Sequence, residues 1–231
     1  MNKLSYIGLY RNFSRVSHWR KQENRDKLDI EKDKEIIKGI NSSIILNSAC
    51  LVEGALNFIL KYLISSFGMH NYAGQVLTEF DVKLRNELKT RILKATWIDY
   101  QNLFKLIVGI ELKNITSVDW EGINYLFTFR NILAHGESID IDYSVTQNDE
   151  DSIEIFETKI MTKENLVNFL IKKKFIPKPN ANNRFQWEFL SNNISNYFYD
   201  LAKNFLFELS EKLPHQDSKQ YIEEWIKSKI K

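Results

Sequence analysis

Most of the chain between residues 29 and 213 has a helical pattern of hydrophobic positions. From Asp29 to Ile64, apolar side chains recur at steps that place them on one side of a helix. The middle of this stretch is apolar almost all round, so the pattern predicts a long helix at the centre of the fold. Further helices are expected over 76–97, 100–108, 119–134, 163–173, 190–209 and 218–229.

A different period interrupts the helices between residues 139 and 155. There Ile, Tyr and Val alternate with Asp, Ser and Glu on both sides of Asn148-Asp149-Glu150-Asp151, which is typical of a β-hairpin. We therefore expect a mainly all-α protein, an antiparallel helical bundle with a small β-hairpin insertion near 137–161. A hairpin of this size does not fold alone, so 29–213 should form one domain. A basic leader over 1–28 and a helix over 214–231 should flank it.

The composition supports a folded interior and narrows the classes of partner. Hydrophobic residues make up 43% of the 231 positions, which is enough for a sizeable core. The formal net charge is only +2, so a nucleic-acid site would have to be a local patch. We find neither a signal-peptide core nor an uninterrupted apolar run of about 18 residues, and we expect a cytoplasmic protein.

Cys50 and the N-terminal positive charges have ordinary explanations. Cys50 lies in an apolar run with no His or basic residue near it in sequence, and we interpret it as a small buried hydrophobe. A single cysteine allows no intrachain disulfide and no cysteine-based zinc site, and we expect no metal or cofactor. The stretch from Arg11 to Lys27 is either an arm that touches a phosphate backbone or, as we favour, a solvated leader.

A polar strip runs along the otherwise apolar helix expected over 119–134. Its members, at steps of four, three and four residues within a sector of roughly 60°, are Asn124, Thr128, Asn131 and His135. Arg130 lies roughly 140° from His135 at the same pitch. A second copy of the helix, related by a two-fold axis, could bring a guanidinium and an imidazole together. The spacing therefore suits a composite site at a dimer seam better than a site within one helix.

The long early helix carries a second polar stripe. Its members, within a sector of roughly 80°, are Ser43, Asn47, Gly54, Asn57 and Lys61. The two stripes could face each other across a cleft, where the expected substrate-binding residues are Asn47, Asn57, Asn124 and Thr128. Glu53, at the margin of the stripe, is the only carboxylate between Glu35 and Glu79. It either serves the site or makes a buried contact between helices, for example to Arg130.

The motif Arg130-Asn131-x-x-x-His135, in an all-helical setting, resembles the signature of the HEPN superfamily. The order of elements is also similar over Asp29 to Leu213: a long helix with an embedded Glu, a helix that ends in the motif, and a final bundle helix. The resemblance implies a dimeric, metal-independent endoribonuclease of a prokaryotic toxin–antitoxin or antiviral defence system. It implies that Arg130 and His135 are the catalytic pair, that Asn131 supports them, and that Glu53 is the acidic residue of the long helix. One HEPN subgroup has a Tyr two residues after the His, where this chain has Glu137.

The chemistry of these side chains agrees with ribonuclease activity. RNA carries its own nucleophile in the 2′-hydroxyl, a histidine can move the proton, and an arginine can stabilise the charge on the phosphorane. The expected products are a 2′,3′-cyclic phosphate and a 5′-hydroxyl. The expected partners are RNA, a second copy of the chain, and an antitoxin or sensor protein, with no membrane. The remaining histidines, expected at the surface, are His18, His70 and His215.

Two other interpretations of the motif stay open. The chain could be a non-catalytic HEPN-like module that holds RNA, a nucleotide or a partner protein. It could also be a structural interaction domain in which Arg130 and His135 cap the negative end of a helix before Gly136.

Overall fold

Helices account for most of the chain in the computed structural model, which describes residues 16–66, 78–147, 153–177, 188–213, 220 and 223–224. The prediction that the protein is mainly helical is confirmed. The helices are α2 (Val16–Asp26), α3 (Lys34–Ser66), α4 (Glu79–Leu93), α5 (Trp97–Val108), α6 (Leu112–Ile115), α7 (Trp120–His135), α8 (Glu164–Lys172) and α9 (Asn192–Lys212). The leader before residue 16 and most of the helix expected over 214–231 lie outside the described residues.

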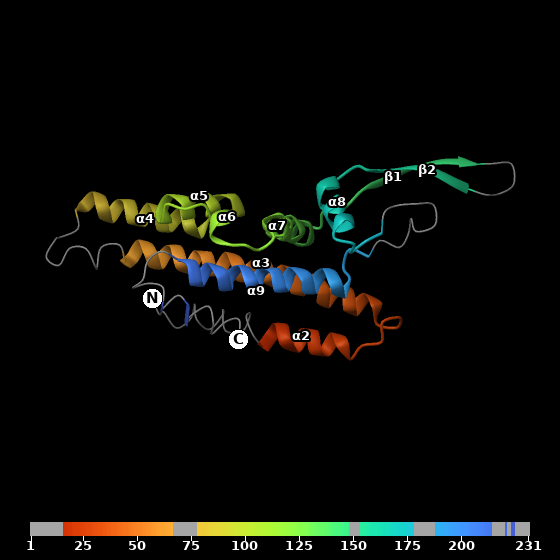
Figure 1. Cartoon of the computed structure of the whole chain (residues 1–231), viewed down its shortest axis with the longest axis horizontal. Coiled ribbons are helices and arrows are strands. Elements are labelled where there is room, and N and C mark those ends of the chain that lie inside the picture. Colours follow the sequence, from red (N-terminus) through yellow and green to blue (C-terminus); the bar gives the residue numbers. More distant parts are fainter. Residues whose placement is uncertain are drawn as a thin grey trace.

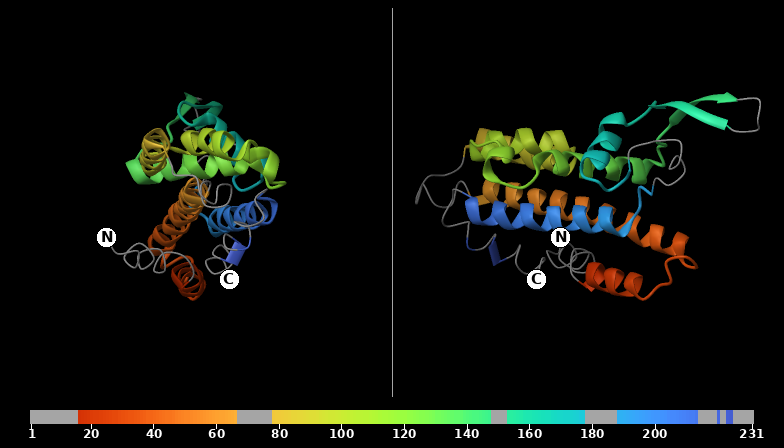
Figure 2. Two further views of the ribbon diagram at one scale, coloured as in Figure 1. Left: turned by 90° about the vertical axis from the view of Figure 1, so that its left-hand side faces the viewer. Right: turned by 45° about the vertical axis from the view of Figure 1, so that its right-hand side comes forward.

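α3 is the central helix, as its nearly uniform apolar character predicts. It runs beside α9 along the length of the molecule, with α4 to α8 on one side of this pair and α2 on the other (Figures 1 and 2). By length and composition alone α3 could also cross a membrane, but 61% of its most apolar window is buried inside the fold. Core helices commonly pass such a test, so the hydropathy of α3 is weak evidence for a membrane span.

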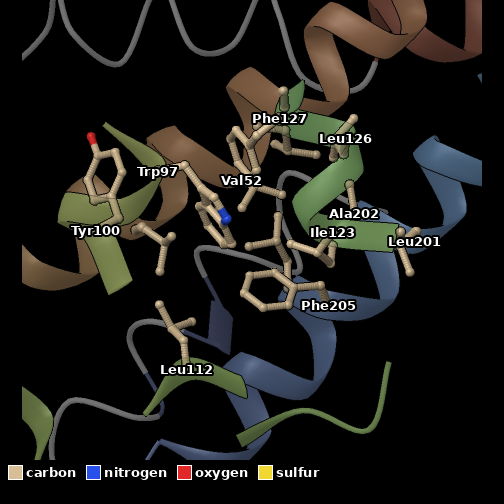
Figure 3. Close-up of a cluster of buried hydrophobic side chains, with 14 of the residues drawn as sticks. Val52, Trp97, Tyr100, Leu112, Ile123, Leu126, Phe127, Leu201, Ala202 and Phe205 are labelled. Carbon is tan, nitrogen blue, oxygen red and sulfur yellow. The ribbon is translucent and has the colours of Figure 1, made fainter. Parts of the chain in front are cut away.

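Aromatic side chains from different helices close the core between α3, α5, α7 and α9 (Figure 3). The indole of Trp97 stacks on the ring of Phe127 with 4.1 Å between centroids, and Phe205 packs against the indole edge. Val52 of α3 lies in the same cluster and is fully buried. Each large side chain buried in this way contributes roughly 1.5–3 kcal/mol of transfer free energy, which holds α7 firmly across α3.

Local signals set the starts of two helices that precede α7. Thr78 and Asp81 form a reciprocal capping box at α4, and Thr96 and Asp99 form another at α5. α5 then ends at Gly109, which adopts the left-handed conformation with a φ of 81°. The helix expected over 76–97 therefore extends too far, because α4 ends at Leu93 and the Thr96 capping box starts α5.

Two antiparallel strands, β1 (Ile141–Gln147) and β2 (Ile153–Ile160), follow α7. Ile141 pairs with Ile160 and Gln147 pairs with Ile153, with an irregularity between Ser144 and Val145. The strands project away from the helices (Figure 1). Residues 148–152, which join them, lie outside the described residues, so the turn of the expected hairpin stays a prediction.

α2 differs from the solvated leader that we favoured for this part of the chain. Its Arg25 is only 3% exposed and donates hydrogen bonds to Asn41 of α3 and to Ser195 and Asn196 of α9. The charge is therefore held by amide and hydroxyl oxygens from two distant segments. The interpretation of Arg25 as a solvated residue is wrong, because its partners could not be recognised from its neighbours in sequence.

Candidate functional site

α7 carries the candidate site in its last two turns. The side chain of Asp119 caps its start by accepting a hydrogen bond from the backbone N–H of Gly122 at 3.1 Å. At its end Gly136 adopts the left-handed conformation with a φ of 63°, and its N–H donates to the carbonyl of Ile132. The expected start at Asp119 and the expected closure by Gly136 are both confirmed.

α7 crosses α3 (Figure 2), and Arg130 of α7 contacts Glu53 of α3. Its Nη2 donates to the carboxylate of Glu53 in an ion pair, and its Nη1 donates to Oδ1 of Asn131 at 2.9 Å. Its Nε is buried and has no hydrogen-bond partner among the described residues. The side chains of Arg130 and Glu53 remain 26% and 20% exposed, so the pair lies at the edge of the core and not within it. The contact between helices that we weighed for Glu53 is therefore present.

The protonation of Glu53 is set by two opposing effects. Burial disfavours the charged carboxylate, and the positive charge and hydrogen bond of Arg130 favour it. Burial is the larger effect, so the pKa of Glu53 is raised above its ordinary value. Glu53 is thus an acid whose charged form burial disfavours and a single described cation, Arg130, favours.

Asn131 and His135 lie on the open side of α7. Both residues are exposed, and the imidazole of His135 has no hydrogen-bond partner within the described part of the chain. No hydrogen bond or ion pair joins Arg130 to His135 among those same residues. A single copy therefore holds the guanidinium against α3 and presents the imidazole to solvent. Neither side chain caps a described backbone carbonyl, so the cap interpretation has no hydrogen bond to support it.

The residues that follow His135 add a second ion pair, which sequence reasoning missed. Lys163, which precedes α8, lies 2.5 Å from the carboxylate of Glu137 and lowers the pKa of Glu137. Lys163 has a φ of 56°, a backbone conformation that is uncommon outside glycine. The hydroxyl oxygen of Thr162 accepts a hydrogen bond from the N–H of Asp140 at 2.8 Å. This bond joins the segment before β1 to the segment after β2. No local sequence signal marks these contacts, because they join residues more than 20 positions apart.

Two of the expected substrate-binding amides are used in packing. Nδ2 of Asn57 donates to the carbonyl of Ile92 and to the hydroxyl of Tyr100, each at 3.3 Å. Oδ1 of Asn124 accepts a hydrogen bond from the indole of Trp97 at 2.8 Å. These bonds lead to α4 and α5, so both amides have partners within the fold, and their contact with a substrate across a cleft stays a prediction. Buried polar groups are normally paired, and α4 and α5 supply the partners.

The other two expected substrate-binding residues have different surroundings. The hydroxyl of Thr128 donates to the backbone carbonyl of Asn124 at 3.2 Å, a bond within α7 itself. Nδ2 of Asn47 is buried and has no partner among the described residues. Contact of either residue with a substrate stays a prediction.

Cys50 is exposed, and our interpretation of it as a buried hydrophobe is wrong. Its apolar neighbours lie on the covered sides of α3, whereas Cys50 lies on the outer side, near Glu53 and Arg130. Although the residue is exposed, surrounding atoms desolvate the thiol, and the charge of Glu53 adds to this effect, so the pKa of Cys50 is raised. The thiol is therefore not activated as a nucleophile.

Within the described ranges, no group of three or more His, Cys, Asp or Glu side chains is placed to hold a metal ion. Comparisons with protein-family models, with curated proteins and with solved structures found no match. Function is therefore inferred from the residues of α3 and α7 alone.

Proposed function

We propose that the protein is a HEPN-like, metal-independent endoribonuclease that acts as a homodimer. The observation that carries the proposal is the end of α7. There Glu53 of α3 holds the guanidinium of Arg130 at the edge of the core, Asn131 accepts a hydrogen bond from it, and His135 faces solvent. A cation that can bind phosphate and an unpartnered imidazole are the two groups that cleavage by the 2′-hydroxyl requires.

A composite site accounts for the separation of the two groups within one chain. Arg130 is held toward α3, whereas His135 faces solvent at the helix end. Two copies of α7 related by a two-fold axis would place the guanidinium of one subunit near the imidazole of the other. Each dimer would then contain two equivalent sites.

The proposed reaction is an internal transfer at phosphorus. The 2′-oxygen bonds to the adjacent phosphorus, and the bond from phosphorus to the 5′-oxygen breaks. The imidazole of His135 accepts the 2′ proton as the phosphorane forms and donates it to the 5′-oxygen as the phosphorane collapses, so protons balance. Arg130 stabilises the charge on the phosphorane oxygens. The products are a 2′,3′-cyclic phosphate and a 5′-hydroxyl.

A non-catalytic RNA-, nucleotide- or protein-binding module is the second candidate. It is favoured by the ion pair itself, because Glu53 already engages the guanidinium that catalysis needs. Such a module would bind RNA without cleaving it and would keep its function after His135→Ala. The ribonuclease proposal also includes a role in a prokaryotic toxin or antiviral defence system. It includes an antitoxin or sensor protein as regulator and a cytoplasmic location.

The deciding experiment uses RNA incubated with purified protein in the presence of a chelator. Cleavage should yield 2′,3′-cyclic phosphate ends and should be lost in Arg130→Ala and in His135→Ala, with little change in melting temperature. Arg91→Ala is the matched control, because Arg91 belongs to an exposed pair with Glu87 on α4. Equal activity of wild type and His135→Ala would exclude the proposed mechanism.

Mixed dimers test whether the site is composite. The Arg130→Ala and His135→Ala chains can be co-expressed with different tags and purified through both tags. One of the two sites in such a dimer would keep both groups, so about half of the wild-type activity should return. A mixed dimer as inactive as its parents would place both groups of each site in one subunit.

A further inference from the structure

The guanidinium of Arg130 is already occupied by groups of its own chain. An arginine side chain has five N–H donors arranged as a rigid fork, which suits two parallel bonds to a phosphate. Here Nη2 donates to Glu53, Nη1 donates to Asn131, and Nε is buried against the protein. A phosphate that made two parallel bonds to either edge of the fork would use at least one Nη group that Glu53 or Asn131 already engages. Binding in the proposed manner thus competes with these two bonds.

We infer that Glu53 is a built-in competitor of the RNA phosphate for Arg130, so that the resting protein is held in a closed, weakly binding form. The inference rests on the proposed function and concerns the regulation of that same site. On binding, the ion pair between α3 and α7 opens and Arg130 turns to the phosphate. Glu53 then stays on α3 without its ion pair.

The surroundings of Glu53 explain why this exchange is opposed and what relieves it. Among the described groups, Arg130 on α7 acts on the charge of Glu53, and the Cys50 thiol on α3 lies near it. Arg130 is the one group that favours the carboxylate, and burial already outweighs it. Once Arg130 has moved to a phosphate, the carboxylate has no cation left among these residues and its pKa rises further, so it takes up a proton. RNA binding should therefore be coupled to proton uptake and should tighten as pH falls.

The first test measures access to Arg130 without any RNA. Arginine-selective dicarbonyl reagents attack the neutral guanidine, which an ion pair disfavours, and mass spectrometry reports the rate for each arginine. Glu53→Gln should raise the rate at Arg130 about tenfold, because a neutral amide holds the guanidinium much less strongly than a carboxylate does. An unchanged rate would overturn the competitor role.

Two arginines serve as controls in the same samples. Arg91 is paired with Glu87 at 3.1 Å on the exposed face of α4, so Glu87→Gln should change the rate at Arg91 less than about twofold. Arg25 is buried and should stay unmodified in every variant that is folded. Modification of Arg25 would identify a variant that has lost its fold, and Glu53→Ala then provides a second variant.

The second test measures binding of an oligonucleotide whose 2′-hydroxyls are methylated, so that it cannot be cleaved. At pH 8 Glu53→Gln should bind about tenfold more tightly than wild type, and the difference should shrink toward pH 5. Comparison at each pH cancels the pH effects that both proteins share. Equal or weaker binding by Glu53→Gln would make Glu53 a positioning residue and refute the competitor role.

The two tests separate the failure of this inference from that of the proposed function. If Glu53→Gln frees Arg130 but neither protein binds the oligonucleotide or cleaves RNA, the ribonuclease proposal fails and the competitor role fails with it. If wild type cleaves RNA while the reactivity of Arg130 is the same in both proteins, only the competitor role fails.

Discussion

Replacement of Arg25 by alanine should destabilise the protein severely, although the residue belongs to a stretch that looks like a solvated leader. The guanidinium donates to Oδ1 of Asn41 at 2.9 Å and to Oγ of Ser195 at 3.1 Å, and both bonds are buried. A hydrogen bond from a charged donor contributes roughly 1.5–3 kcal/mol, so the two together are worth about 3 kcal/mol or more. The contact with Asp26 adds little, because that carboxylate is 63% exposed.

Part of this cost is recovered in the variant. Oδ1 of Asn41 also accepts a hydrogen bond from Ser195 at 2.8 Å, so it does not become an unsatisfied buried acceptor when Arg25 is lost. We therefore expect a loss of about 3 kcal/mol in the free energy of unfolding, equivalent to roughly 6–12 °C in melting temperature for a domain of this size. The free energy of unfolding of Arg25→Lys should lie between those of Arg25→Ala and wild type, because lysine keeps the charge but lacks the planar guanidinium with its several N–H donors.

Urea unfolding followed by far-ultraviolet circular dichroism measures this loss, with the midpoint and the slope reported together. Arg91→Ala removes an arginine from an exposed pair and should stay within about 0.5 kcal/mol of wild type. If Arg25→Ala has the stability of Arg91→Ala, the buried network around α2 contributes nothing and the reasoning above is refuted.

Two further predictions concern the residues that position α7. A Cβ at Gly122 would lie 2.3 Å from the hydroxyl of Tyr197 and 2.8 Å from a methyl of Leu201. Gly122→Ala should therefore lower stability by about 1–3 kcal/mol in chemical denaturation despite its better helix propensity, and an unchanged midpoint would show that the neighbours simply move. Burial raises the pKa of Asp119, but its bonds to Lys173, Tyr197 and Gly122 together lower it below the ordinary 3.8. Because the folded pKa lies below the unfolded one, this stabilisation is present above pH 3.8 and is lost as pH falls through the folded pKa. The advantage of wild type over Asp119→Asn in melting temperature should shrink below pH 3.8, and a constant difference would contradict this.

The central helix and the ends of α7 could be expected from sequence because their causes are local, whereas α2 and the position of the break between α4 and α5 were not predicted. The apolar period over 29–64 anticipated α3 at Lys34–Ser66, and the Asp119 and Gly136 signals anticipated both ends of α7. Hydrogen bonds of caps and helices span three or four residues, so nearby residue types suffice to predict them. The motif that carries the candidate site was visible for the same reason.

Burial and side-chain pairing were less predictable, as Cys50, Arg25 and the polar stripes show. An apolar run does not say which side of a long helix its neighbours will cover, and Cys50 lies on the uncovered side. The partner of Arg25 at Ser195 is 170 positions away. The amides of Asn57 and Asn124 lie on the polar stripes, but α4 and α5 pack against them and take their hydrogen bonds.

The sequence by itself determined that the chain is mainly helical, where α7 begins and ends, and which short segment carries both an arginine and a histidine. Only the tertiary structure decided that Arg130 is held by Glu53, 77 positions earlier, while His135 faces solvent. The physical reason is the range of the forces involved. Backbone hydrogen bonds and caps act between neighbours, whereas desolvation and ion pairing depend on which distant surfaces are packed together.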